Sequence, residues 1–229
     1  MNRDRTGVIV ISLGGSLIVP DVIDVPFLKK FIALIQKRIT LGERFVLITG
    51  GGKICRNYQK SAGELGVIDS VSNDWIGIYT TRLNGEFLRI LFGDLAYKTV
   101  VCDPRVLVLE KSVTVVAGEK PGQSTDSVAV EIAKKVGAKH LINLSNVDFI
   151  YDKDPKFFAD AKRLEKTSWA DFQKIMPKDW QPGMHFPFDP IATKVAEEEK
   201  IEVAFMNGKD LVNVENYLDG TPFIGTLIS

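Results

Sequence analysis

The chain predicts an α/β fold, a three-layer α/β/α sandwich with a mainly parallel central sheet. Short apolar runs rich in β-branched residues alternate with longer amphipathic stretches along the 229 residues, and this alternation is typical of strand–helix–strand units. The apolar runs are almost unbroken, as expected of parallel strands buried on both faces. Two of them end in glycine turns, Gly14-Gly15-Ser16 and Gly50-Gly51-Gly52. Ligands of open parallel sheets bind at such strand ends.

The expected strands are short and rich in valine and isoleucine. They are Val8–Leu13, Phe45–Thr49, Thr99–Cys102, Val106–Leu109, Val113–Val116, His140–Leu144, Val203–Met206 and Phe223–Ile228. Because they alternate with helices over the whole chain, we expect a single domain over residues 1–229. A first part, roughly 1–143, and a second part, 144–229, would share its sheet.

The expected helices show apolar residues at helical spacing, several of them behind a proline or a capping residue. They are Pro26–Thr40, Lys53–Leu65, Ser72–Phe92, a helix capped by Thr125 or Asp126 and ending near Val136, Trp169–Met176, and Pro190–Lys200. The three tryptophans, Trp75, Trp169 and Trp180, are interpreted as core or interface residues. The aromatic-rich loop Met184–Phe188 is interpreted as packing or as a wall of the site.

Charge and cysteine content narrow the classes of function. The 29 Lys and Arg residues balance 29 Asp and Glu residues, so no broad basic surface is expected for nucleic acid or an anionic membrane. Cys55 and Cys102 make neither a disulfide framework nor a CxxC metal pair, and no structural metal site is expected. The run Val8–Leu13 is too short for a membrane span or a signal segment. We expect a cytoplasmic protein with no nucleic-acid or membrane partner.

The two glycine turns are the strongest candidates for a site. Glycine lets backbone N–H groups approach an anion, and the dipole of a following helix favours negative charge there. Neither turn fits the P-loop or the dinucleotide fingerprint. For either turn alone, a tight strand-to-helix connection is an adequate explanation. Two such turns favour phosphate binding by a donor loop and an acceptor loop that face each other.

Arg56 follows the second turn by one helical turn, with Lys53 before it. A guanidinium can hold a phosphate through two parallel hydrogen bonds, whereas lysine acts as a point charge. The alternative is a solvated basic helix face that includes Lys60. The position near a helix amino end favours a functional Arg56.

Three further segments are weaker candidates. Pro121–Asp126 carries hydroxyls and a carboxylate into a helix, and its alternative role is a plain helix cap. Asn146–Pro155 holds three aspartates and two aromatic residues. It suits ribose and base binding, or else Asx-turns in a polar loop. Asp189–Lys194 begins a helix, and Lys194 either reaches a phosphoryl group or is a surface lysine.

Taken in order, these segments resemble the amino-acid-kinase superfamily and, within it, the archaeal-type UMP kinases. The matching stretches are Ser12–Leu17, Gly50–Arg56, Asp74–Asn84, Pro121–Asp126, Asn146–Lys156, Asp189–Lys194 and Gly225-Thr226. They cover almost the whole chain in the order of the family, and this collinearity is more specific than any one motif.

The resemblance implies the amino-acid-kinase fold, with ATP as donor, Mg²⁺ carried by the ATP, UMP as acceptor and UDP as product, a step in pyrimidine nucleotide biosynthesis. It implies that the first part of the chain binds the acceptor and the second part binds ATP. It also implies a homo-oligomer, a hexamer built from dimers.

The resemblance assigns acceptor residues by motif position. Gly51, Gly52 and Arg56 would bind the phosphate of UMP. Asp74 would bind its ribose, and the pair Ser124-Thr125 would lie against the uridine. The resemblance also implies three catalytic residues, which are Asp126, Lys194 and Gly15. Of these, Asp126 would organise the transfer site and Lys194 would help to neutralise phosphate charge.

The remaining assignments concern ATP. Gly14, Gly15 and Ser16 would cradle its phosphates. The residues that would line its base and ribose are Asn146, Tyr151 and Asp154.

The sequence departs from the family pattern in three places. Ser12 stands where many members carry a lysine, and Glu119 precedes the Pro-Gly turn, where its charge would be unfavourable near a phosphate unless it were paired, for example with Lys120. The Pro182–Phe188 loop also differs. These departures leave two alternatives open. One is a non-catalytic relative that binds nucleotide or oxyanion, as the molybdenum-storage proteins do, and the other is a kinase of another small acceptor.

Overall fold

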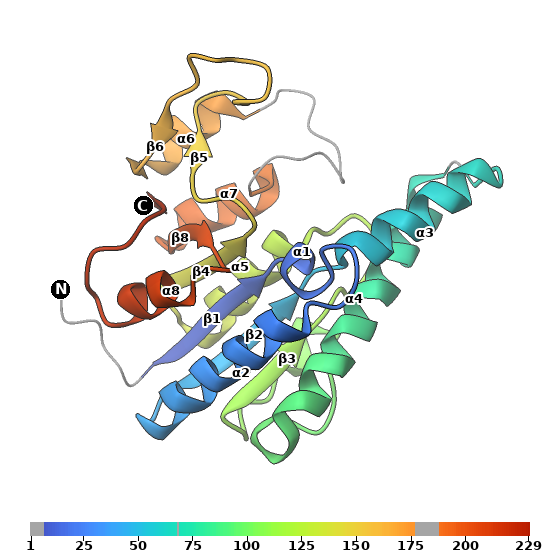
Figure 1. Ribbon diagram of the computed structural model, residues 1–229, viewed down its shortest axis with the longest axis vertical. Helices are drawn as coiled ribbons and strands as arrows, with labels where there is room; N and C mark the ends of the chain where they lie inside the picture. Colours follow the sequence, from blue (N-terminus) through green and yellow to red (C-terminus); the bar gives the residue numbers. More distant parts are fainter. Residues whose placement is uncertain (1–6, 68, 177–187) are drawn as a thin grey trace.

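The computed structural model describes residues 7–67, 69–176 and 188–229. Within them, a seven-stranded sheet has the strand order β3-β2-β1-β4-β8-β9-β7. Its paired strands are parallel, except that β9 runs antiparallel to β8. Helices cover both faces of this sheet (Figure 1). The predicted α/β/α sandwich with a mainly parallel sheet is therefore confirmed.

The strands of the sheet have the following bounds. They are β1 (Val8–Leu13), β2 (Arg44–Thr49), β3 (Val113–Val116), β4 (His140–Ser145), β7 (Lys166–Thr167), β8 (Glu202–Asn207) and β9 (Thr226–Ile228). A separate antiparallel hairpin joins β5 (Ile150–Tyr151) to β6 (Arg163–Leu164) and lies at one end of the molecule with helix α6 (Figure 1).

The α-helices range from one turn to more than six. They are α1 (Gly15–Ile18), α2 (Val25–Thr40), α3 (Gly52–Glu64), α4 (Ser70–Phe92), α5 (Thr125–Val136), α6 (Trp169–Ile175), α7 (Pro190–Glu198) and α8 (Leu211–Leu218). Two short 3₁₀-helices, η1 (Gly93–Leu95) and η2 (Pro104–Val106), lie between α4 and β3. No helix in the described ranges is both long enough and apolar enough to cross a bilayer.

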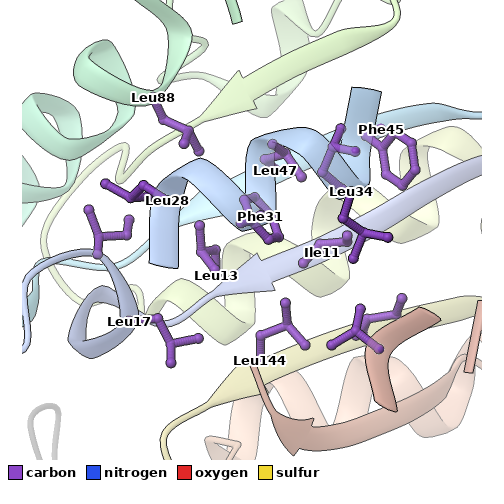
Figure 2. Packing of buried hydrophobic residues seen from close by; sticks show 14 of the residues in the cluster. Ile11, Leu13, Leu17, Leu28, Phe31, Leu34, Phe45, Leu47, Leu88 and Leu144 are labelled. Carbon is purple, nitrogen blue, oxygen red and sulfur yellow. The ribbon is translucent and has the colours of Figure 1, made fainter. Parts of the chain in front are cut away.

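The sheet separates two hydrophobic cores. Alternate residues of each strand face opposite sides, so Ile11 and Leu13 of β1 pack under α2, α4 and α8. Figure 2 shows Phe31 and Leu34 of α2 over these strand residues. Val10 faces the other core, which α5, α6 and α7 cover. Every strand of the centre is therefore buried on both faces, as its unbroken apolar sequence predicted.

Two predicted strands are wrong. Thr99–Cys102 makes one isolated bridge between Val101 and Val116, because the chain runs beside β3 for too few residues to form a ladder. Val106–Leu109 is not a strand either. The carboxylate of Asp103 accepts a hydrogen bond from the Arg105 N–H at 2.8 Å and, with Pro104, starts the 3₁₀-helix η2 instead.

Other differences concern ends and short elements. The cap of α5 is Ser124 and not Thr125 or Asp126, since the Ser124 hydroxyl accepts from the Ser127 N–H at 3.0 Å. Helix α7 ends at Glu198, two residues early, and β9 begins at Thr226, after Phe223 and its neighbours. The sequence did not predict α1, α8, β5, β6 or β7.

The tryptophan interpretations have separate outcomes. Trp169 is 4% exposed and packs against Phe172 and Phe188, so it is a core residue. Trp75 is 38% exposed on α4, which leaves only an interface role for it. Trp180 and most of the Met184–Phe188 loop lie outside the described residues; Phe188 itself is buried.

An ion triad of a buried pair, Arg38 and Glu43, and the more exposed Asp219 lies at the end of the molecule opposite the glycine turns. Arg38, at the end of α2, is 1% exposed. Its guanidinium donates to both oxygens of Glu43, one of them at 2.7 Å, and to Asp219 after α8 at 2.5 Å. The hydrogen bond to Glu43 is the main cause that raises the pKa of Arg38. The triad therefore joins α2, the turn before β2 and the end of α8.

We expect Glu43→Ala to lower the free energy of unfolding by roughly 3–5 kcal/mol, because it leaves a buried guanidinium without its main partner. The matched control is Lys37→Ala, which removes the exposed pair with Glu215 and should cost less than about 1 kcal/mol. Urea unfolding measures both. Equal losses in the two variants would contradict a dominant role for the triad.

Candidate active site

The two glycine turns are in direct contact. β1 and β2 are parallel neighbours with Leu13 opposite Thr49, so the turns that follow them lie side by side. The Gly50 N–H donates to the Leu13 carbonyl at 3.0 Å. A Cβ atom added to Gly15 would lie 2.1 Å from the backbone nitrogen of Gly52. No side chain fits between the turns, so the predicted convergence of two glycine turns at one sheet edge is confirmed.

The second turn leads into helix α3. Gly52 is its first residue and has a φ of +70°, which favours glycine. Arg56 lies in the second turn of α3 and is exposed, whereas Lys53 is half-buried. The guanidinium of Arg56 makes no ion pair or hydrogen bond with a described residue. An exposed guanidinium close to a helix amino end is available to an anionic ligand.

Helix α4 holds the second turn in place through side-chain hydrogen bonds. The side-chain amide of Asn84 is 5% exposed and donates to the carbonyl oxygens of Gly50 at 2.8 Å and Gly51 at 3.1 Å. With both carbonyls held on the α4 side, the turn keeps one backbone conformation. The sequence predicted no role for Asn84, although this residue ends the stretch Asp74–Asn84, which is one of those that carry the family resemblance.

The same helix also holds the loop that precedes α5. One carboxylate oxygen of Asp74 accepts from the Gly122 N–H at 2.7 Å. Arg82 donates to the carbonyls of Gly118 at 3.0 Å and Glu119 at 2.9 Å. Glu119 is paired, with Arg105 at 3.6 Å and Lys120 at 3.9 Å. Glu119 therefore has the pairing with Lys120 that the sequence offered as one way to relieve its charge, and Arg105 shares it.

Asp126 is the second residue of α5, and the residue as a whole is half-buried. Asn143 of β4 donates to its Oδ1 at 2.9 Å. Burial raises the pKa of Asp126 to about 7, and the nearby charge of Asp189 adds to the rise. Hydrogen bonds from Asn143 and from the backbone of Phe188 act in the opposite direction. A carboxyl group that titrates near neutrality is typical of a functional site.

Ser12 lies on β1 beside Asn143, the residue opposite it on β4. It is 3% exposed, and Val10, two residues earlier on the strand, packs in the core under α5. The position that carries a lysine in many resembling proteins is therefore a buried serine close to the Asn143–Asp126 hydrogen bond.

The first turn and the segments after β4 occupy the other side of the site. The Gly14 N–H donates to the Leu144 carbonyl at 2.9 Å, so this turn is tied to the end of β4. Ser16 is half-buried in α1. Lys194 is exposed on α7 and makes no ion pair with a described residue.

The three residues predicted for a base and ribose are spread over the chain after β4. Asn146 is exposed in the loop, and Tyr151 is half-buried on β5. Asp154 accepts from the Lys156 N–H at 2.8 Å, which is the Asx-turn that the sequence offered as its alternative role. Ser124 and Thr125 are both half-buried at the start of α5, and the Ser124 hydroxyl donates to Asp189.

Two hollows are lined in part by residues of α5, α6 and α7. The first, of about 430 Å³, is lined by α5 and α7 and by Arg105 and Gln123 among others. A second, of about 460 Å³, lies near His140 and Trp169. Neither is lined by the glycine turns. Across the described residues, no group of three or more His, Cys, Asp or Glu side chains is placed to hold a metal ion.

The fold and the paired turns define an α/β protein in which two glycine turns meet at the carboxyl edge of a mainly parallel sheet. The model of the amino acid kinase family matches residues 7–207. A uridylate kinase of Methanospirillum hungatei is 35% identical over 225 residues, which cover 96% of this chain and 94% of that protein. A uridylate kinase of Sulfurisphaera tokodaii is 34% identical over 209 residues, 88% of this chain and 92% of that protein.

A solved structure agrees with these relatives. The crystal structure of uridylate kinase from Archaeoglobus fulgidus matches with a TM-score of 0.80 and 31% identity, covering 97% of this chain and all (100%) of that one. This chain therefore belongs to the amino acid kinase family.

Asp126 makes stability depend on pH in a defined direction. Its pKa is raised from 3.8 to about 7 in the folded protein, so the folded state keeps a proton that the unfolded state loses at lower pH. This stabilisation is present in full below about pH 4 and is lost as the pH rises through 7. Asp126→Asn, which stays neutral, should remove that loss.

We expect Asp126→Asn to be more stable than the unsubstituted protein at pH 8, by roughly 2–4 kcal/mol at about 1.4 kcal/mol per pKa unit, and similar to it at pH 4. Thermal unfolding across this range, without nucleotide, measures the difference. Asp154→Asn is the matched control at an exposed carboxylate. A constant difference between pH 4 and 8 would show that Asp126 titrates at its ordinary pKa.

Proposed function

We propose that this chain is a UMP kinase, which transfers the γ-phosphoryl group of ATP to UMP and yields UDP and ADP. The observation that carries the proposal is the contact between the two glycine turns, because transfer needs the two phosphate groups at adjoining positions. Relatives named uridylate kinase that are about one third identical over nearly the whole chain support UMP as the acceptor. The reaction belongs to pyrimidine nucleotide biosynthesis, and we place it in the cytoplasm, where both nucleotides occur.

The acceptor site is proposed at the second turn. Gly51 and Gly52 present backbone N–H groups at the start of α3, and Arg56 adds a guanidinium that no described residue engages. Asp74 would hold the ribose with the oxygen that does not accept from Gly122. The start of α5, at Ser124 and Thr125, would contact the uridine, with the Ser124 hydroxyl committed to Asp189.

The donor site is proposed at the first turn. Gly14, Gly15 and Ser16 would cradle the phosphates of ATP at the ends of β1 and β4. Lys194 would neutralise part of their charge. The base and ribose would lie against residues of the segment after β4, namely Asn146, Tyr151 and Asp154.

Magnesium would enter with the ATP, bound to its phosphate oxygens. Mg²⁺ usually keeps several waters and binds through substrate phosphates, so this arrangement needs no ligand cluster made by the protein alone. Once bound, Mg²⁺ would supply neutralisation of the phosphate charge. The protein's share is then the backbone N–H groups, Arg56 and Lys194.

The transfer itself asks for positioning more than for covalent chemistry. A phosphate oxygen of UMP attacks the γ-phosphorus, the bond from that phosphorus to the bridging oxygen breaks, and ADP leaves with the electron pair. Asp126, held by Asn143, would orient the cationic groups around the transferred phosphoryl. Because Ser12 supplies no positive charge from β1, Lys194 becomes the principal lysine of the transfer site.

The test is product formation with MgATP and a panel of acceptors: UMP, CMP, AMP, acetylglutamate and carbamate. We expect UDP from UMP at a kcat/KM at least about tenfold above that for any other acceptor. Absence of UDP at saturating nucleotide would refute the proposal. ATP binding without any transfer, together with retained molybdate, would instead identify a non-catalytic oxyanion-binding relative.

Arg56→Ala separates the two halves of the site. Hydrogen bonds to charged groups contribute about 1.5–3 kcal/mol, so we expect the KM for UMP to rise about 10–100-fold while the KM for ATP changes less than about threefold. Lys60→Ala is the matched control, one turn further along α3 and paired with Glu64 at 3.7 Å. Steady-state kinetics measure both, and equal damage to the two nucleotides would contradict this division.

We also propose that the chain forms a homo-oligomer through α4, with dimers assembling into a hexamer. Large apolar side chains recur every four residues on the exposed face of this helix. They are Val71, Trp75, Tyr79 and Leu83, which are 55%, 38%, 63% and 59% exposed. An apolar stripe of this kind on one helix suits a self-complementary contact with a second copy.

Leu83→Glu should therefore lower the molar mass in solution, because a charge within the stripe, here at its carboxyl end, opposes its burial. Light scattering coupled to size-exclusion chromatography measures the mass. Val212→Glu on α8, which is 71% exposed in the unsubstituted protein, is the control and should leave the mass unchanged. A monomeric unsubstituted protein would disprove the assembly.

A further inference from the structure

Asp189 is not among the residues assigned to either nucleotide, yet its carboxylate joins two helices of the site. One oxygen, Oδ1, accepts from the backbone N–H groups of Ile191 at 2.8 Å and Ala192 at 3.0 Å, and so caps α7. The other, Oδ2, accepts from the hydroxyls of Ser124 and of Ser127, the latter at 2.8 Å. Both serines lie at the amino end of α5.

These two helices carry the two side chains proposed for the transfer. Asp126 lies two residues after Ser124 on α5, and Lys194 lies five residues after Asp189 on α7. Ser124 is itself the cap of α5. The cap of one helix therefore donates a hydrogen bond to the cap of the other, and the starting points of both helices share one carboxylate.

Two other aspartate caps among the described residues make hydrogen bonds to one helix and not to two. Asp210 caps α8 by accepting from the Asn213 N–H at 3.0 Å, and Asp69 caps α4 by accepting from the Ser72 N–H at 2.7 Å. Neither side chain has a hydrogen bond to a second helix among the described residues. Capping alone thus needs one oxygen, and the second oxygen of Asp189 has a different task.

The burial of Asp189 also supports a role in connecting α5 to α7. The residue is 3% exposed, and no described lysine or arginine pairs with it. A buried carboxylate without a cation is costly unless hydrogen bonds satisfy it. A serine would cap α7 without that cost, so the charge and both oxygens are explained by the connection between the helices.

We propose that Asp189 is a positioning residue that locks the amino ends of α5 and α7 together and so fixes Asp126 relative to Lys194 across the transfer site. This inference rests on the proposed function for its kinetic consequence. Its structural part is independent of that function.

The connection of α5 to α7 through Asp189, called the lock below, also has an electrostatic consequence, which an uncharged packing contact would not have. Asp189 is the charged group that raises the pKa of Asp126 beyond the effect of burial, while the other neighbours, Asn143 and the backbone of Phe188, are neutral. Replacing Asp189 by the neutral Asn should therefore lower the pKa of Asp126. If the ionised form of Asp126 serves the transfer, the acidic limb of the kcat profile moves to lower pH.

The kinetic experiment compares Asp189→Asn with Asp210→Asn, which alters a helix cap that makes no hydrogen bond to a second helix among the described residues. We expect Asp189→Asn to lower kcat about 10–100-fold with both KM values within about threefold, since small misplacements of reacting groups cost this much. The acidic limb should shift down by on the order of one pH unit. Asp210→Asn should change neither. A kcat within twofold of the unsubstituted enzyme, or an equal loss in both variants, would overturn the proposal.

Two further measurements need no catalysis. Carbon-13 NMR titration of the Asp126 carboxyl in the nucleotide-free protein should give a lower pKa in Asp189→Asn than in the unsubstituted protein. Hydrogen exchange should speed up in Asp189→Asn at the amides of Ser127, on α5, as well as Ile191 and Ala192, on α7. Faster exchange confined to α7, with an unchanged Asp126 titration, would mean that Asp189 is only a cap.

These readouts keep the two proposals separate. If the unsubstituted protein makes no UDP, the proposed function fails, while the titration and the exchange pattern still decide whether Asp189 joins the helices. If Asp189→Asn does not fold, Ser127→Ala removes one hydrogen bond to Oδ2 and leaves both caps. It should then give a smaller fall in kcat, of roughly threefold, and an unchanged kcat in that variant would count against the lock.

Discussion

The contact between Gly15 and Gly52 is the constraint on which the rest of the site depends. The backbone of one turn meets the backbone of the other at a distance that no Cβ atom permits. Two parallel strands with neighbouring ends create this contact, and glycine at both positions makes it possible. Because the chain is neutral overall, two highly charged molecules can be held only by such local arrays of N–H groups and a few placed cations.

Helix α4 stabilises the backbone around this contact between the two turns. Helix α4 holds the second turn through Asn84 and the loop before α5 through Asp74 and Arg82. The exposed face of the same helix carries the apolar stripe proposed for assembly. An oligomer formed through α4 would thus stabilise the helix that shapes the acceptor side, which links assembly to catalysis in physical terms.

Much of this arrangement was predictable from the sequence because its signals are local. The unbroken apolar run of β1 and the glycines after it predicted both a buried strand and its turn. Short or edge elements were not predictable: Val106–Leu109 looks like a strand by composition, but the Asp103-Pro104 pair dictates a 3₁₀-turn. Helix α8, with its cap at Asp210, was overlooked although its amphipathic spacing was present.

Among the site residues, those that lie in local motifs could likewise be predicted, and those whose partners are distant in the sequence could not. Turn glycines, Arg56 and Asp126 lie in recognisable motifs, and their positions were predicted. Asn84 and Asp189 act through partners 34 and 65 residues away in the sequence, so no local pattern could reveal what they hold. Asp154 illustrates the reverse case, since its motif suggested a ligand contact and the structure shows that one oxygen makes an Asx-turn.

The most direct measurement of the central claim is inhibition by a compound that joins adenosine and uridine, 5′ to 5′, through a chain of phosphates. If the two turns hold the donor and the acceptor in one shared cleft, this compound should compete with both ATP and UMP and bind more tightly than either. Competition with only one nucleotide, at an affinity no better than that nucleotide's own, would contradict a site built on the contact of the two turns.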